Sequence, residues 1–316
     1  MKTDLKDAVQ LLSENDNFLI LIHKNPDGDT IGSGYALCRA LQKAGKHARV
    51  ECSDSIPERF QYISSSVETE DFTPGFVVAV DVADTKLLGD KFDETVQIDL
   101  CIDHHGSNTH YAKHNYVNST SASNCENIYH VIRLMGIEQD AEMAKALYTG
   151  IATDTGCFKF SNTTAQTHII AAELMEYDIN IADINKVMFD TKTKSRVAVE
   201  KLALENMEFY FDDKLALITI TKEMREISES DGDDLEGITS LPTQIEGILI
   251  GLTIRERSDG TYKVSVRTYD PINASNMCRT FGGGGHARAA GCEMEGDLQS
   301  VKDRLLTVSA QMLGVK

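Results

Sequence analysis

Acidic residues and histidines gather in four short segments, each placed where an apolar run or a helical pattern stops. The segments are HKNPDGD at 23–29, VDVAD at 80–84, DHH at 103–105 and TDTG at 153–156. Several carboxylates buried beside imidazoles cannot all stay ionised unless cations neutralise them. The four segments together therefore predict a metal centre. The metal-type ligands in these segments are His23, Asp27, Asp29, Asp81, Asp84, Asp103, His104, His105 and Asp154.

The predicted centre combines imidazole and carboxylate groups, a set that suits Mn²⁺ better than Mg²⁺ or Ca²⁺ and leaves Co²⁺, Fe²⁺ and Zn²⁺ open. These groups are too many for one tetrahedral ion, so we expect two divalent metal ions that share a carboxylate. Two-metal centres activate water for in-line attack on phosphate esters. A single acid after a strand, such as Asp84, is more often a helix cap, so the prediction depends on all four segments.

The four segments need a fold that brings them together, and the first two-thirds of the chain predicts one. Short apolar runs alternate there with helical patterns, which is typical of an α/β fold with a mostly parallel sheet covered on both faces and flanked by helices. Because the carboxyl ends of parallel strands meet at one edge, the strand-terminal segments should converge. The predicted strands are 18–23, 47–52, 76–82 and 96–103. The predicted helices are 31–44, 121–135, 140–152, 164–177 and 181–190.

In the rest of the chain, strands and helices follow one another in a different pattern, which favours two domains. We expect a metal-binding domain over 1–190, a linker helix over 191–209 and a smaller α+β domain over 210–316. In the last of these, strands are predicted at 215–220, 245–256 and 262–268, and an amphipathic helix at 298–313.

A glycine run, FGGGGHARAAG at 281–291, lies in a locally basic part of the sequence. Residues 251–290 hold six bases and three acids, whereas the whole chain carries a formal charge of −18. Backbone N–H groups that no side chain covers can cradle an anion, and an arginine can form two hydrogen bonds with one phosphate. The predicted anion contacts are Arg267, Gly283, Gly284, Gly285 and His286.

The composition limits the other classes of function. The longest apolar runs, at 18–22 and 76–80, are too short to span a membrane, and the first residues lack a signal-peptide pattern. The seven cysteines are widely spaced without a CxxC pair, which argues against a disulfide framework. We therefore expect a cytoplasmic protein without a membrane partner, and its net charge disfavours long nucleic acids.

The order HKNPDGD, VDVAD, DHH and TGIATDTG closely resembles the four motifs of the DHH phosphoesterase family, and the resemblance covers essentially the whole chain. It implies two metal sites, with Asp81 as the bridging ligand. One site would use His23, Asp27 and Asp81, and the other would use Asp29, Asp81, His104 and Asp154. The resemblance further implies catalytic roles for His105, which would face the substrate phosphate, and for Asp103, which would orient a neighbouring histidine.

The segments VSVRT and FGGGGHARAAG resemble the substrate-binding domain of the nanoRNase and oligoribonuclease branch, of the bifunctional oligoribonuclease and PAP phosphatase type. This implies hydrolysis of short RNA oligonucleotides and dinucleotides to 5′-mononucleotides. It also implies removal of phosphate from a nucleoside bisphosphate, 3′-phosphoadenosine 5′-phosphate (PAP), to leave AMP. A signalling phosphodiesterase for cyclic di-AMP or pApA is the alternative. A non-catalytic nucleotide-binding module is disfavoured because no ligand is missing, and the choice between monomer and homodimer stays open.

Overall fold

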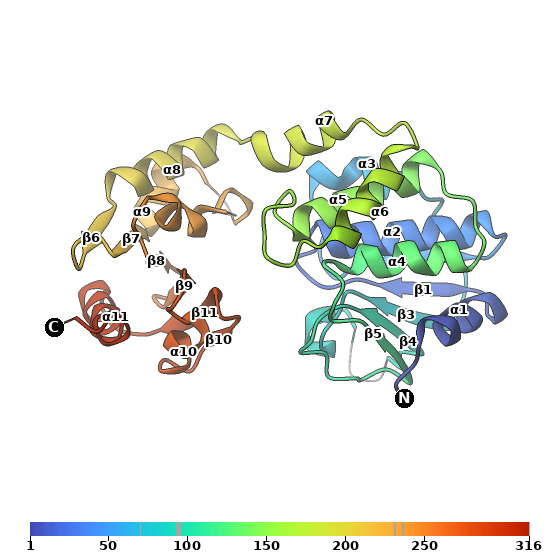
Figure 1. The fold of residues 1–316 in the computed structure, drawn as a ribbon, viewed down its shortest axis with the longest axis horizontal. Helices are drawn as coiled ribbons and strands as arrows, with labels where there is room; N and C mark the ends of the chain where they lie inside the picture. Colours follow the sequence, from blue (N-terminus) through green and yellow to red (C-terminus); the bar gives the residue numbers. More distant parts are fainter. Residues whose placement is uncertain (70, 93–95, 231, 236, 316) are drawn as a thin grey trace. The chain divides into compact units, whose positions relative to one another are not determined.

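The computed structural model describes residues 1–69, 71–92, 96–230, 232–235 and 237–315. The chain divides into two compact units, residues 1–191 and residues 192–316 (Figure 1). Each unit has its own sheet and its own hydrophobic core.

The first unit is built on a five-stranded sheet in the order β2-β1-β3-β4-β5, in which all neighbouring strands are parallel. The strands are β1 (Phe18–Leu21), β2 (Ala48–Glu51), β3 (Phe76–Val80), β4 (Leu100–Asp103) and β5 (His114–Val117). Every residue of β1 is buried, as expected for a strand covered on both faces. The mostly parallel α/β fold predicted from the sequence is confirmed.

Helices cover one face of this sheet, where α2, α4 and α5 lie side by side (Figure 1). The α-helices of this unit are α1 (Leu5–Glu14), α2 (Gly28–Lys43), α3 (Gln61–Ser64), α4 (Asn124–Leu134), α5 (Ala141–Asp154), α6 (Ala165–Met175) and α7 (Ile181–Asn185). The shorter turns are η1 (Glu58–Phe60), η2 (Thr85–Leu88) and the π-helical η3 (Lys186–Asp190). The opposite face packs against Leu88 of η2 and against Ile98 and Ala112 in the connecting segments.

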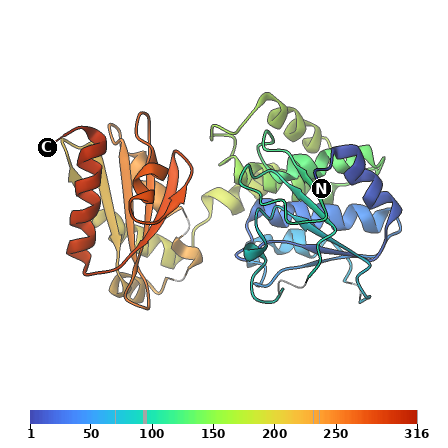
Figure 2. The ribbon, with the colours of Figure 1, turned by 90° about the horizontal axis from the view of Figure 1, so that it is seen from below.

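The second unit contains a six-stranded sheet in the order β10-β11-β9-β8-β7-β6, in which β7 and β8 are parallel and the other pairs antiparallel. Figure 2 shows α11, in red, lying along this sheet. The strands are β6 (Glu208–Tyr210), β7 (Leu215–Ile220), β8 (Ile250–Glu256), β9 (Tyr262–Thr268), β10 (Gly284–Gly285) and β11 (Ala289–Met294). The helices are α8 (Lys194–Glu205), α9 (Lys222–Ser228), η4 (Asp233–Leu235), η5 (Ile238–Gln244), α10 (Ala274–Arg279) and α11 (Leu298–Leu313).

The two faces of the second sheet differ. Val264 and Val266 point into a core shared with α10 and α11. On the other face, Ile218 packs with Val199 of α8 and Ile238 of η5. Helix α8, within the range expected to be a linker, thus packs onto the sheet of the second unit. None of the helices in the described part of the chain is both long and apolar enough to cross a membrane.

Candidate active site

The ends of β1, β3, β4 and α5 deliver the acidic and histidine side chains singled out in the sequence. His23 lies two residues beyond β1, and Asp81 directly follows β3. His104 directly follows β4, and Asp154 is the last residue of α5. Because β1, β3 and β4 are parallel neighbours, their carboxyl ends meet at one edge of the sheet.

Helix α2 supplies two further carboxylates through its first turn. Asp27 is its N-cap and accepts hydrogen bonds from the backbone N–H groups of Asp29 and Thr30, both at 3.1 Å. Close packing of α2 on α5 requires a glycine here, because a Cβ on Gly28 would lie 2.3 Å from the Thr153 hydroxyl oxygen. This packing holds the first turn of α2 against the end of α5. The sequence predicted a helix from 31, whereas the Asp27 cap starts it at Gly28.

The carboxylate of Asp29 is fixed by a helix that sequence reasoning did not connect to it. The backbone N–H groups of Asn124 and Cys125, at the start of α4, donate to Asp29 at 2.6 and 2.8 Å. The local N-cap, Ser123, makes no side-chain capping hydrogen bond. Asp29 therefore caps α4 from α2, where the positive end of the helix dipole favours a carboxylate. The only signal in the sequence was the polar entry into the predicted helix 121–135.

The side chains form three overlapping groups whose ligand atoms lie within 4.8 Å of one another. The first group contains His23, Asp27 and Asp81; in it, His23 Nε2 lies 3.6 Å from Asp27 Oδ1 and 3.8 Å from Asp81 Oδ2. A second contains Asp29, His104 and Asp154, with His104 Nε2 3.7 and 3.9 Å from the two carboxylates. The third contains Asp81, His104 and His105.

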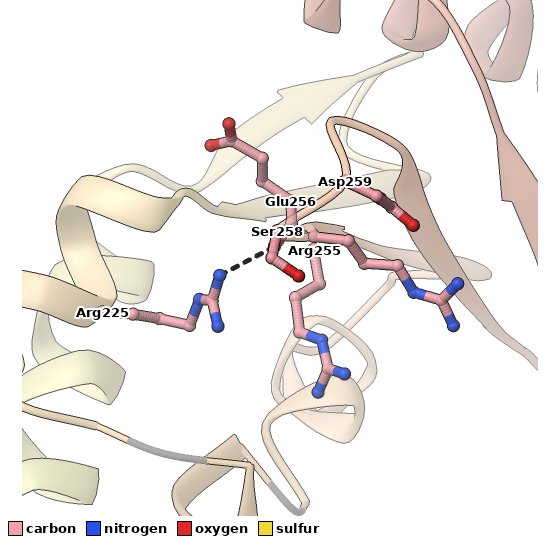
Figure 3. Close-up of a pocket in the computed structure, with 6 residues that line it drawn as sticks. Arg225, Arg255, Glu256, Ser258 and Asp259 are labelled. Carbon is pink, nitrogen blue, oxygen red and sulfur yellow. Dashed lines mark hydrogen bonds between the residues drawn. The ribbon is translucent and has the colours of Figure 1, made fainter.

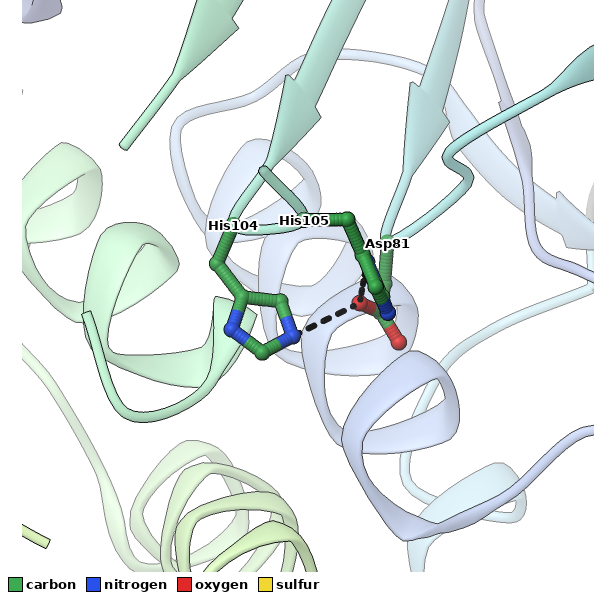
Figure 4. Close-up of side chains that lie close together, drawn as sticks. All are labelled: Asp81, His104 and His105. Carbon is green, nitrogen blue, oxygen red and sulfur yellow. Dashed lines mark ion pairs between the residues drawn. The ribbon is translucent and has the colours of Figure 1, made fainter. Parts of the chain in front are cut away.

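Asp81 lies between these groups, and its two carboxylate oxygens face different histidines. Oδ2 is the atom near His23, while Oδ1 lies 3.5 Å from His104 Nε2 (Figure 4). Oδ1 is buried and accepts no hydrogen bond within the described part of the chain. Asp81 also has a φ of 58°, a left-handed conformation that non-glycine residues adopt at an energetic cost and that is common at functional sites.

The acids of the centre repel one another because they are buried together. Burial raises the pKa of Asp29 to about 6 and that of Asp154 to about 7, and other carboxylates nearby add to both shifts. Burial and the charges of Asp29 and Asp27 raise the pKa of Asp81 well above its usual range. An orphaned buried carboxylate oxygen among crowded acids and imidazoles is the environment that divalent cations stabilise. The residues present therefore fit a metal centre.

Asp103 and His105 form a pair beside these groups. Asp103 is fully buried, and its Oδ1 lies 2.8 Å from His105 Nδ1 and accepts the backbone N–H of His104, also at 2.8 Å. Its Oδ2 accepts from the side-chain amide of Asn108 at 2.6 Å. His105 Nδ1 is also 3.5 Å from Asp81 Oδ1. Sequence reasoning missed Asn108, which carries no motif signal of its own.

The predicted anion contacts lie in the second unit, on β9 and the hairpin of β10 and β11. Arg267 pairs with Ala289 across the strands, and the carbonyl oxygen of Ala289 accepts the backbone N–H of His286 at 2.8 Å. Gly284 and Gly285 form β10. A Cβ on Gly283 would lie 2.2 Å from the Gly291 carbonyl oxygen, so only glycine fits there.

The glycine run also borders a surface pocket of the second unit. Among the predicted anion contacts, the pocket lining includes Gly283. His286 is exposed, and Arg267 is half-buried, with its Nη1 donating to the carbonyl oxygen of Val266 at 3.2 Å. The pocket is lined by Lys263, Phe281, Gly282, Gly283, Gly291, Cys292 and Glu293.

Comparison with known proteins identifies both units. The family model described as "DHH family, N-terminal domain" matches residues 17–151, and the DHHA1 domain matches residues 221–313. A bifunctional oligoribonuclease and PAP phosphatase NrnA from Thermus thermophilus is 33% identical over 296 residues, which cover 91% of this chain and 87% of that protein. The Bacillus subtilis protein of the same name is 25% identical over 300 residues, 93% of each chain.

Solved structures share the fold. An exopolyphosphatase-related protein from Bacteroides fragilis superimposes with a TM-score of 0.87 at 24% identity, over 96% of this chain and 94% of that chain. RecJ from Thermus thermophilus, in complex with Mn²⁺, gives a TM-score of 0.58 at 14% identity, over 97% of this chain and 55% of that chain. The chain therefore belongs to the DHH family of phosphoesterases.

Proposed function

We propose that this protein is a Mn²⁺-dependent phosphoesterase of the cytoplasm that hydrolyses dinucleotides and short oligoribonucleotides to 5′-mononucleotides. We further propose that it removes a phosphate from PAP to leave AMP. The observation that carries the proposal is the position of Asp81, whose two oxygens face two separate histidine and carboxylate groups. The names of the relatives from T. thermophilus and B. subtilis support the two substrates.

Two sets of side chains, which share Asp81, would hold the two cations. His23, Asp27 and Asp81 would hold one cation, and Asp29, Asp81, His104 and Asp154 the other. Divalent cations at such a centre supply Lewis acidity toward phosphoryl oxygens and lower the pKa of water.

The remaining polar side chains position the substrate. Asp103 holds Nδ1 of His105, and Nε2 has no partner within the described part of the chain, so this nitrogen can contact a phosphate oxygen. Arg267 and the exposed side chain of His286 would bind a second anionic group of the nucleotide, because the backbone N–H groups of Gly283 and His286 already donate to the carbonyl oxygens of Cys278 and Ala289.

A hydrolysis panel tests the proposed function. The protein is stripped of metal with EDTA, supplied with Mn²⁺, and given a 5′-phosphorylated diadenylate, a short oligoadenylate, PAP, cyclic di-AMP and pyrophosphate in parallel. We expect rapid release of AMP from the diadenylate, the oligoadenylate and PAP, and none without metal.

Two results would contradict the proposal. Faster turnover of cyclic di-AMP than of the linear oligoribonucleotides would identify the protein as a signalling phosphodiesterase. Nucleotide binding without hydrolysis of any substrate, in protein shown to have bound Mn²⁺, would identify a non-catalytic module. Size-exclusion chromatography with light scattering distinguishes the monomer from the homodimer.

A further inference from the structure

Three arginines line a second surface pocket in the second unit, at the turn between β8 and β9. Arg225 comes from α9, Arg255 from β8, and Arg257 from the residues directly after β8. Figure 3 shows the guanidinium groups of Arg225 and Arg255 on the same side of the strand. The other lining residues are Glu256, Ser258 and Asp259. Neither the metal centre nor the glycine run uses this pocket.

The positive charges of this pocket are largely uncompensated. Arg255 pairs through its backbone with β7 and β9, but its side chain forms no hydrogen bond or ion pair with any residue that the structure describes. Arg225 donates from Nη2 to the backbone oxygen of Glu256 at 3.1 Å, and its buried Nε has no partner among the described residues. Arg257 alone is ion-paired, with Glu293 at 2.8 Å. Guanidinium groups that lack acidic partners are ready to bind an oxyanion.

The acidic residues of the pocket are engaged elsewhere. The Glu256 side chain accepts the backbone N–H of Lys222 at 2.9 Å, and Figure 3 shows it pointing away from Arg225 and Arg255. The Asp259 carboxylate accepts hydrogen bonds from the backbone N–H and the hydroxyl of Thr261, at 2.9 and 2.7 Å. These acids therefore leave Arg225 and Arg255 free for an outside anion.

Basic residues on β9 extend this positive charge toward the glycine run. Arg255 pairs with Lys263 across β8 and β9, and Lys263 lies on the same face of β9 as Arg267. Arg267 lies four positions beyond Lys263 along the extended strand, a distance of about 13 Å. Burial and the neighbouring arginines lower the pKa values of Arg255 and Lys263, as expected where cations crowd together. A row of cations of this length suits a ligand with several phosphates in series.

We propose that the basic row of Arg225, Arg255, Lys263 and Arg267 binds the phosphodiester backbone of an oligoribonucleotide, beyond the nucleotide held at the glycine run. The substrate class rests on the proposed function. This row makes the second unit favour strands of several nucleotides over dinucleotides. It also supplies locally the positive charge that a chain of −18 otherwise lacks.

Binding of RNA to the full-length protein in EDTA tests this proposal without hydrolysis. The probes are fluorescently labelled oligoadenylates of two to seven nucleotides, followed by fluorescence anisotropy. In Arg225→Gln/Arg255→Gln we expect the heptamer to bind about tenfold more weakly and its salt slope to fall by about 1.4, for two lost phosphate contacts. Dinucleotide affinity should stay within about twofold of wild type. The matched control, Lys194→Gln/Lys201→Gln, removes two exposed charges from α8 and should match wild type.

Three outcomes would overturn the basic row as a strand site. The double variant could bind the heptamer as wild type does, or lose dinucleotide and heptamer binding equally. Alternatively, the two arginines could prove necessary for ATP or inorganic triphosphate but not for the heptamer, which would identify a site for free polyphosphates. Failure of the proposed function gives a different result, because arginine-dependent heptamer binding would persist while Mn²⁺-loaded protein hydrolysed no RNA.

Discussion

The carboxylate of Asp103 fixes the ring of His105, with Oδ1 2.8 Å from Nδ1 in a fully buried position. This contact sets which nitrogen of the ring faces away from the protein. In Asp103→Asn, an amide replaces one acceptor oxygen and the ring loses its fixed orientation. We expect kcat for the diadenylate to fall about 10- to 100-fold with KM unchanged. Steady-state kinetics at saturating Mn²⁺ measure both parameters.

The Asp103→Asn experiment requires a check on the metal and on folding. Manganese content by mass spectrometry and the thermal midpoint should match those of Asp90→Asn, which changes an exposed acid outside the centre. If Asp103→Asn lost bound manganese in proportion to activity, Asp103 would be a support for the metal ligands rather than for His105.

Asp81→Asn should weaken Mn²⁺ binding without lowering the thermal stability of the metal-free protein. Asparagine keeps the side-chain shape and tolerates the left-handed backbone at this position. Loss of the bridging charge should reduce bound Mn²⁺ by at least one equivalent and kcat/KM by more than about a hundredfold. In EDTA, however, the variant should melt at the same or a higher temperature than wild type, since burial and like charges no longer destabilise a carboxylate there.

Calorimetric Mn²⁺ titration and melting curves with and without EDTA measure these effects. If Asp81→Asn retained the full Mn²⁺ stoichiometry and near-normal activity, Asp81 could not be the shared ligand. A much lower melting temperature in EDTA would instead point to a structural role.

The sequence predicted those helices and strands in which apolar runs are long or apolar residues recur at regular spacing. The predicted strands at 215–220 and 262–268 coincide with β7 and β9, and the final helix with α11. Strand β5 was missed because its residues, HNYV, are polar or mixed and form an edge strand. Helix α1 was not among the predicted helices, although Ala8, Val9 and Leu12 are buried with helical spacing.

The candidate site was predictable for a physical reason. Parallel topology forces the ends of β1, β3 and β4 together, so His23, Asp81 and His104 could be grouped from position alone. The residues that hold these side chains in place could not be predicted from strand position. The contacts of Asn108 with Asp103 and of Cys125 with Asp29 depend on how loops and helices pack, and no spacing rule encodes them.

The close approach of α2 and α5 should make Gly28 intolerant of a larger side chain. In Gly28→Ala the new Cβ would lie 2.3 Å from the Thr153 hydroxyl oxygen and 2.9 Å from its Cβ. We expect the free energy of unfolding to fall by about 1–3 kcal/mol, with weaker Mn²⁺ binding because Asp27 and Asp29 move with the helix.

Urea unfolding and calorimetry measure the two effects of Gly28→Ala. The double variant Gly28→Ala/Thr153→Ala should recover part of both losses, since residues in contact show non-additive energies. Strict additivity of the two substitutions would argue against a clash between these residues.

Asp140 couples the stability of α5 to pH. Its carboxylate caps the helix at the Met143 N–H and receives the Arg39 guanidinium at 2.9 Å. Burial opposes the charge, but the hydrogen bonds and the charge of Arg39 lower the Asp140 pKa below its usual value. A lowered folded-state pKa means that the stabilisation is present above the unfolded value near 3.8 and is lost as pH falls through the folded value.

Asp140→Ala should therefore reduce the free energy of unfolding by about 1 kcal/mol at pH 7 and by much less below pH 3. Urea titrations in EDTA at both pH values measure the difference. Asp140→Asn keeps a capping group and should lose less at pH 7. A penalty for Asp140→Ala that stayed constant between the two pH values would contradict the role of the charge.

Arg267 should act on substrate capture rather than on the chemical step. Its half-buried guanidinium donates within the described structure only to the carbonyl oxygen of Val266, so most of its N–H groups remain available to a phosphate. Arg267→Gln should raise KM for the diadenylate about tenfold, with kcat within about twofold and Mn²⁺ affinity unchanged. The control is Arg288→Gln, because Arg288 already binds the Asp270 carboxylate and the Ile272 carbonyl oxygen and should leave KM unaltered. An equal rise in KM for both variants would mean that general charge, and not the position of Arg267, determines capture.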